Sequence, residues 1–347
     1  MGDALGHTSG VDAFPVHRGA LRWAFRGLGA GLVLGTLLGC AGLTGDSAGA
    51  DSAEADSASE AAAPLDVLLV FDTSGSMTES GGALVLGADD IVAALGEEDW
   101  RFGITTTSAN YASGPTSGVD PGEAGTLVAA AIVPGSDAVL DLRIALACST
   151  IYFKESGLRS DPDYHGEEGD CPEPESGVVS WEYLDCLCPD GWNQDEGSGT
   201  EEGLEAAVDA LCRGEDPPDS CFDDSVPITA ADAGSVDLWR EDSRRRIWVI
   251  SDEGDGSRRV PTADASAEVY LDLFEELGGP RFSCIGPRYV EQDGTCLDGA
   301  QTWGVQRYQA AVEGTGGEYR ALTEGPDEDC AGRDVAALLA EGLAEDH

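Results

Sequence analysis

One short apolar run constrains the fold of this chain more than any other feature. Residues 65–71 read Leu-Asp-Val-Leu-Leu-Val-Phe, with a single early charge and turn-forming residues directly afterwards. The run has no helical period, whereas an amphipathic helix would keep one polar face. It therefore predicts a strand that is covered on both faces, as the strands of parallel sheets are.

Further apolar runs alternate with helical segments over residues 65–343. This alternation is typical of an α/β domain with a mainly parallel sheet and helices on both of its faces. Residues 149–199 interrupt the pattern with turn-forming and acidic residues and three cysteines, so we interpret them as a disulfide-tied insertion. The predicted strands are 65–71, 101–107, 126–133, 246–251, 282–285 and 318–322, and the predicted helices are 83–95, 136–148, 201–211, 263–277, 302–312 and 335–343.

Residues 1–39 form a predicted export signal. Arginines precede an uncharged run over residues 27–39, which is too short and too rich in glycine for a permanent membrane span. The junction that follows, Leu-Leu-Gly-Cys40-Ala, resembles the lipobox of bacterial lipoproteins, which implies lipid attachment to Cys40. Residues 40–64 contain almost no large apolar side chain and are predicted to be a flexible linker. We expect an exported protein with a lipid anchor in a bacterial membrane, and the alanine after Cys40 favours the outer membrane or cell surface.

The charge of the chain excludes one class of partner. There are 66 acidic and 19 basic residues, a formal net charge of −47. Nucleic acid is excluded, because phosphate binding requires the opposite sign. So large an excess also strains the compact state unless cations or disulfides offset the repulsion. The sequence contains cysteines for disulfides and, as described below, candidate ligands for a cation.

The cysteine content indicates an oxidising compartment. Ten cysteines are present, and lipid attachment to Cys40 leaves an odd number, so one stays unpaired or pairs with another molecule. The short-loop pairs that we expect first are Cys212 with Cys221 and Cys284 with Cys296. The cysteines expected to tie the insertion are Cys148, Cys171, Cys186 and Cys188.

Small oxygen-bearing side chains follow the first predicted strand. Asp72, Ser74 and Ser76 stand at alternate positions just beyond its carboxyl end, where α/β sheets hold their ligands. A carboxylate and two hydroxyls, without sulfur or imidazole, suit a hard cation. Mg²⁺ or Mn²⁺ is favoured, and Ca²⁺ is allowed if the loop relaxes. This stretch therefore predicts a divalent-metal site.

The stretch resembles the metal-ion-dependent adhesion site of the von Willebrand factor A (vWA) family, built on Asp-x-Ser-x-Ser after the first strand. The resemblance extends over residues 65–343 and implies a Rossmann-like, three-layer α/β fold. The family takes a threonine and an aspartate from two later loops, which match Thr200 in Gly-Ser-Gly-Thr200-Glu and Asp252 in Ile-Ser-Asp252-Glu. One departure is the loop Asp-Glu-Gly-Asp255, where many members have Asp-Gly. Asp255 is then either a further ligand or, as we favour, a solvated loop residue.

The resemblance implies a surface module for adhesion or protein binding. Asp72 and Asp252 neutralise a divalent ion, and one coordination position is left for an Asp or Glu side chain of a partner protein. The competing interpretation is a structural envelope protein that uses cations only to hold an acidic surface together. An enzyme is the weakest interpretation. Cleavage of the signal peptide leaves only His165 and His347 for a Ser/His or Cys/His arrangement, and a metal-dependent hydrolase needs a separate general base that the resemblance does not offer. We therefore predict a protein that is not an enzyme.

Overall fold

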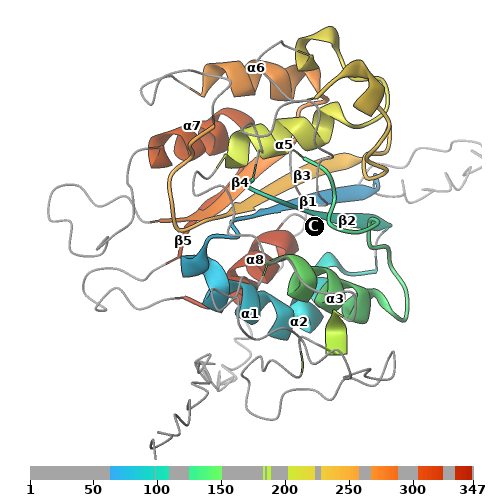
Figure 1. Ribbon diagram of the computed structural model, residues 1–347, viewed down its shortest axis with the longest axis vertical. Coiled ribbons are helices and arrows are strands. Elements are labelled where there is room, and N and C mark those ends of the chain that lie inside the picture. Colours follow the sequence, from blue (N-terminus) through green and yellow to red (C-terminus); the bar gives the residue numbers. More distant parts are fainter. Residues whose placement is uncertain are drawn as a thin grey trace, which may run out of the picture. The chain divides into compact units, whose positions relative to one another are not determined.

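A parallel sheet organises the domain (Figure 1). The computed structural model describes residues 63–97, 99–108, 125–150, 183, 186–188, 202–222, 228–257, 267–287, 304–322 and 333–345. Within these residues, five strands pair in the order β2-β1-β3-β4-β5, and every neighbouring pair is parallel. The strands are β1 (Leu65–Phe71), β2 (Trp100–Thr106), β3 (Arg244–Ile250), β4 (Arg281–Gly286) and β5 (Tyr319–Ala321). The predicted α/β class with a parallel sheet is confirmed.

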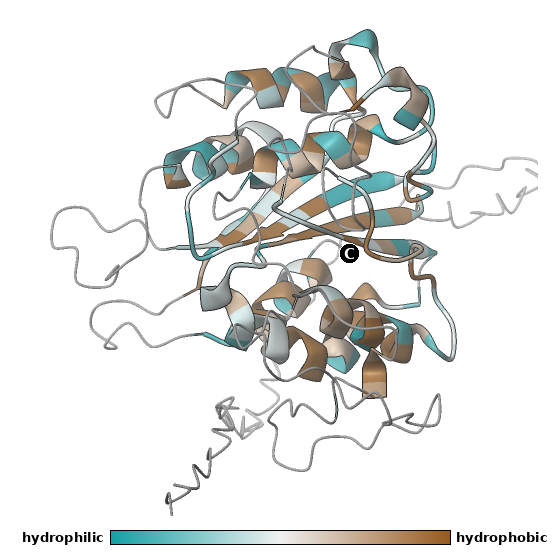
Figure 2. Ribbon diagram, viewed as in Figure 1, coloured by the Kyte–Doolittle hydropathy of each residue, from teal (hydrophilic) through white to brown (hydrophobic). Residues whose placement is uncertain are grey.

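Helices cover both faces of this sheet (Figure 1). Val67 and Leu69 of β1 pack toward one group of helices, and Leu68 and Val70 pack toward the other. This two-sided burial explains why the strand is a continuous apolar run, and Figure 2 shows hydrophobic residues along the sheet. The first group is α1 (Thr78–Leu86), α2 (Ala88–Leu95), α3 (Ala138–Thr150) and α8 (Val335–Ala344), and the second is α5 (Gly203–Cys212), α6 (Glu268–Glu276) and α7 (Val305–Thr315).

The single helix predicted over residues 83–95 is two helices. α1 begins earlier, at Thr78, and α2 begins after Gly87. Gly87 lies against α8, because a Cβ at this position would be 2.3 Å from the Cβ of Ala336. The close approach of α8 therefore requires a residue without a side chain at the junction.

The strand predicted over residues 126–133 is wrong. The segment makes one isolated antiparallel bridge, between Ile132 and Phe102 of β2. One further backbone bond runs from the Val128 N–H to the Ile104 carbonyl, at 2.9 Å. Three consecutive alanines at 129–131 offer little of the packing that β-branched side chains provide on a pleated surface. The segment borders β2 and does not extend the sheet.

Disulfides connect loops to two of the helices. Cys212 at the end of α5 pairs with Cys221, as their short spacing predicts. Cys148 in α3 pairs with Cys188, so one bond closes the base of the predicted insertion. Cys186 is also disulfide-bonded.

The predicted pairing of Cys284 with Cys296 is wrong. Cys284 is a free cysteine and is fully buried in β4. Its side chain belongs to the core between the sheet and the helices α5, α6 and α7, so it does not reach a loop cysteine. Burial also raises the pKa of this thiol well above its usual value, which keeps it in the unreactive neutral form.

Some predicted features lie outside the described residues. Of the helices that are described, none is long and apolar enough to cross a membrane. The features outside are the signal peptide 1–39, Cys40, the linker up to residue 62, Thr200, most of the insertion 149–199 with Cys171, and Cys296.

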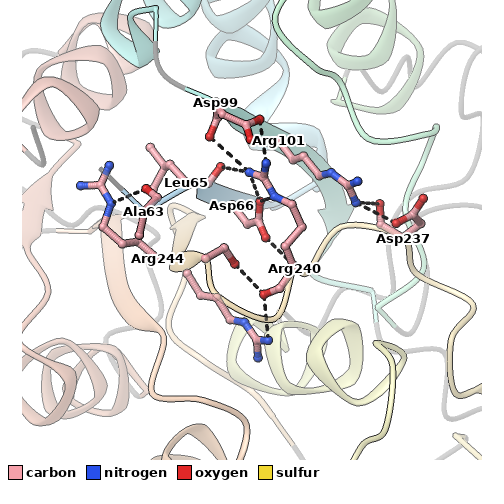
Figure 3. A network of polar contacts seen from close by, with 10 residues as sticks. Ala63, Leu65, Asp66, Asp99, Arg101, Asp237, Arg240 and Arg244 are labelled. Atoms are coloured by element: carbon pink, nitrogen blue, oxygen red, sulfur yellow. Dashed lines mark hydrogen bonds and ion pairs between the residues drawn. The ribbon is translucent and has the colours of Figure 1, made fainter. Parts of the chain in front are cut away.

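An ion pair between a buried carboxylate and a partly exposed arginine holds the amino end of β1 (Figure 3). Asp66 is fully buried, and its carboxylate pairs with the guanidinium of Arg240 at 2.6 Å and accepts the Arg240 backbone N–H at 2.7 Å. The same guanidinium donates to the Leu65 carbonyl at 3.1 Å and pairs with Asp99 at 2.7 Å. This network lies at the opposite end of β1 from Asp72.

Candidate metal centre at the carboxyl edge of the sheet

Asp72 lies directly beyond β1, at the carboxyl edge of the sheet. Its backbone N–H continues the β1–β3 pairing by donating to the Ile250 carbonyl at 2.9 Å. Its side chain is fully buried. One carboxylate oxygen accepts the Ser74 backbone N–H at 2.8 Å, and the other accepts the Ser251 hydroxyl at 2.7 Å. These donors come from two different loops, and together they fix the orientation of the carboxylate.

Two hydroxyls connect the first loop to a second acid. Ser74 Oγ and Ser76 Oγ are 2.9 Å apart, and the Ser76 hydroxyl donates to Asp252 Oδ1 at 3.2 Å. Asp252 follows β3, the neighbour of β1, so the parallel pairing brings the two loops together. The buried side chain of Met77 holds the short 3₁₀ helix η1 (Gly75–Met77) that carries Ser76. The structure thus places these three predicted ligands beside Asp72.

Burial raises the pKa values of both acids of this cluster. It raises the pKa of Asp72 to about 6, against the hydrogen bonds from Ser74 and Ser251, and the nearby charge of Asp252 adds to the rise. Burial also raises the pKa of Asp252 and of Glu253, which feels the charge of Asp252 as well. Negative charge is therefore crowded at this edge, and a positive ion between the acids would relieve it.

The available donors are of the kind that hard divalent cations prefer, because two carboxylates and two hydroxyls offer only oxygen. In the part of the chain that the structure describes, no group of three or more His, Cys, Asp and Glu side chains is placed to hold a metal. The hydroxyl oxygens are thus needed to complete a coordination shell here. Ser76 is exposed and Asp252 is partly exposed, so the cluster is open to solvent.

The fifth predicted ligand, Thr200, lies outside the described residues. The chain after it is described from Glu202, whose backbone N–H donates to the Thr107 carbonyl at 3.1 Å. The Thr107 N–H in turn donates to the carbonyl of Phe71, the residue before Asp72, at 3.0 Å. The segment leading into α5 is therefore held at the same edge of the sheet as the cluster.

The prediction that Asp255 is a solvated loop residue is wrong, and the alternative of a further metal ligand stays a prediction. The Asp255 side chain is fully buried and pairs with Arg307 of α7 at 3.1 Å. It also accepts the Leu204 N–H at 3.1 Å and the Ser257 hydroxyl at 2.6 Å. A signal was present in the sequence: Arg307 lies one turn before Ala311 on the apolar side of its helix, and a buried arginine requires an acidic partner.

Comparisons with known proteins yield structural matches alone. No protein-family model and no curated protein matches the chain. An aerotolerance-related membrane protein from Bacteroides fragilis NCTC 9343 is similar at 12% identity, over 81% of this chain and 99% of that chain, with a TM-score of 0.32. The conserved hypothetical protein BatB from Bacteroides thetaiotaomicron is similar at 12% identity, over 81% and 98%, with a TM-score of 0.34. The pilus adhesin SpaC from Lactobacillus rhamnosus GG is similar at 11% identity, over 82% of this chain and 31% of the adhesin, with a TM-score of 0.38. Similarities this low assign no function to the chain.

Proposed function

We propose that this chain is an exported, lipid-anchored envelope protein with a vWA-type domain. In this proposal the domain binds a divalent cation and, through it, an acidic side chain of a protein partner. The observation that carries the proposal is the hydrogen-bonded path from Ser74 through Ser76 to Asp252, beside the buried carboxylate of Asp72. The Asp-x-Ser-x-Ser spacing and the position of Asp252 after a neighbouring strand support the same assignment.

The residues of the cluster have different tasks in this function. Asp72 is held by two donors, so its carboxylate is oriented in advance for a cation. Asp252 contributes the second negative charge, and the hydroxyls of Ser74 and Ser76 add neutral oxygen donors. When bound, Mg²⁺ or Mn²⁺ would supply a positively charged coordination position for a carboxylate oxygen of the partner. Because Ser76 is exposed, a partner reaches the cluster directly from solvent.

The charge of the whole chain restricts the partner. A net charge of −47 repels acidic surfaces, although the cluster itself is proposed to bind an acidic side chain. We therefore expect a partner whose surface is basic around a single Asp or Glu.

The alternative function is structural. In that case cations hold an acidic envelope protein together and no specific ligand is bound. The two functions differ in one observable property, because only the adhesion function requires selective capture of a carboxylate.

Metal binding is tested by titrating the full chain with Mg²⁺ or Mn²⁺ in a calorimeter. Carboxylate capture is tested with immobilised basic peptides that contain one Asp, compared with the same peptides carrying Asn. The test variant is Asp72→Asn. The matched control is Asp237→Asn, which removes one charge from a side chain that is 94% exposed and lies at the amino edge of the sheet.

Wild type and the Asp237→Asn control should bind the cation and capture the Asp peptide only in its presence. Asp72→Asn should lose both properties. Metal binding without selective capture would favour the structural alternative, and a wild-type chain without metal affinity would contradict both functions.

A further inference from the structure

The start of α5 is capped by a distant loop of the chain. The first N–H groups of a helix have no acceptor within the helix. In α5, the Leu204 N–H donates to Asp255 Oδ1 at 3.1 Å, and the Glu205 N–H donates to Ser257 Oγ at 2.9 Å. The N-cap residue of α5 makes no side-chain cap of its own. The loop after β3 therefore caps α5 in place of a local N-cap side chain.

These two bonds join the segments that the proposed metal centre depends on. Asp255 and Ser257 belong to the same short loop as Asp252. The helix that they cap follows Thr200 almost directly in the sequence. The loop that carries Asp252 is thus hydrogen-bonded directly to the first turn of α5.

Arg307 holds Asp255 in this position. Besides its ion pair with the carboxylate at 3.1 Å, the guanidinium donates to the carbonyls of Asp255 and Ser257 at 3.4 and 3.0 Å. It also lies over the ring of Tyr270, 5.4 Å from the centroid, and the Tyr270 hydroxyl donates to Glu205 at 3.0 Å. All of these residues are buried, so water does not compete strongly for their hydrogen bonds.

Backbone packing adds a second constraint on the same loop. Gly304 precedes α7 with φ +92°, a conformation that favours glycine. A Cβ at this position would lie 2.4 Å from the Asp255 carbonyl oxygen. Only glycine allows α7 to approach the loop this closely, so Asp255 is held through both its backbone and its side chain.

We infer that Asp255, together with Ser257 and Arg307, is a positioning group of the proposed metal centre. It does not touch the cation, but it holds the Asp252 loop against the segment that follows Thr200. This inference rests on the proposed metal-binding function. A network that served only the stability of the fold would change the melting temperature and leave the metal affinity unaltered.

The test compares Mg²⁺ affinities of the full chain by calorimetry, at a temperature where every variant is folded. Asp255→Asn and the milder Ser257→Ala should each weaken the affinity about tenfold, which is the low end for groups that orient metal ligands indirectly. Asp66→Asn is the matched control, because Asp66 is equally buried and is also paired with an arginine, but at the other end of β1. The control should lower the melting temperature and leave the affinity unchanged.

Each outcome is decisive. Wild-type affinity in both Asp255→Asn and Ser257→Ala, with only the melting temperature lowered, would overturn the positioning role and leave the proposed function intact. An equal loss of affinity in Asp66→Asn would overturn it too, because the effect would then follow from general destabilisation. If Asp255→Asn does not fold, Ser257→Ala decides alone. A wild-type chain that binds no Mg²⁺ would remove the proposed function and this inference together.

Discussion

Replacing Asp72 by asparagine should stabilise the metal-free protein. Burial raises the pKa of this fully buried carboxyl from 3.8 to about 6. At neutral pH the folded chain therefore holds a carboxylate that water would solvate better in the unfolded chain. Asparagine has nearly the same shape without the charge, and its oxygen still accepts the Ser74 N–H. The Ser251 hydroxyl has a second acceptor in the Glu253 carbonyl, at 3.3 Å.

The size of this effect follows from the pKa. A displacement of about two units is worth about 3 kcal/mol at neutral pH, since one unit corresponds to about 1.4 kcal/mol. Hydrogen bonds to an amide are weaker than those to a carboxylate, so we expect a net gain of about 1–3 kcal/mol. In a domain of this size each kcal/mol moves the melting temperature by about 2–4 °C, which gives a rise of about 2–12 °C.

Thermal denaturation near neutral pH, in chelator and in saturating Mg²⁺, measures the effect. In chelator the asparagine variant should melt above the wild type. In Mg²⁺ only the wild type should gain stability, because a ligand that binds the folded state alone stabilises it. A variant that melts below the wild type in chelator would refute the argument that the ionised Asp72 is costly. A Mg²⁺ response of equal size in both proteins would refute the assignment of Asp72 as a ligand.

Three further predictions concern pH and the amino edge of the sheet. Because the folded-state pKa of Asp72 is raised to about 6, its contribution to stability is lost as the pH of the metal-free protein rises from about 4 to 6. Below pH 6 a cation has to displace the proton of Asp72, so the Mg²⁺ affinity should fall about tenfold for each pH unit of acidification. A calorimetric Mg²⁺ affinity that stays constant down to pH 5 would contradict this prediction. Arg240→Met leaves the buried Asp66 without its partner and should lower the free energy of unfolding in urea by about 3–5 kcal/mol. A loss below about 1 kcal/mol would show that this pair is no stronger than an exposed one.

The strands of the sheet are largely predictable from local pattern. β1 has the predicted bounds, because each of its residues is buried on one face or the other. β3 begins at Arg244, whereas the predicted strand begins at Arg246. The prediction missed the start because the first three residues of β3 are arginines that are only partly buried. Their charge hides the start of the strand, yet Arg245 reaches the Leu277 carbonyl at 2.6 Å and pairs well within the sheet.

The failures share one cause, which is that burial is a property of the whole fold. Residues 126–133 have the local pattern of a strand, but they form only one isolated bridge to β2. Their alanines are too small to provide the side-chain packing that would extend the sheet. Cys284 stands at a short spacing from Cys296, but β4 directs its thiol into the helix-covered core. Neither outcome follows from the neighbouring residues alone.

The sequence by itself determined the first loop of the candidate metal centre. Asp72, Ser74 and Ser76 belong to one short segment after a buried strand, so their local spacing suffices to bring their oxygens together. The tertiary structure decided what lies against this loop. Parallel pairing of β1 with β3 brings Asp252 to the Ser76 hydroxyl. The surroundings of Asp255 depend on a helix that follows later in the chain, because an acid in a loop faces water unless distant segments enclose it with a cation and N–H donors. That enclosure buries a residue that was predicted to be solvated and lets it link the loop after β3 to the first turn of α5.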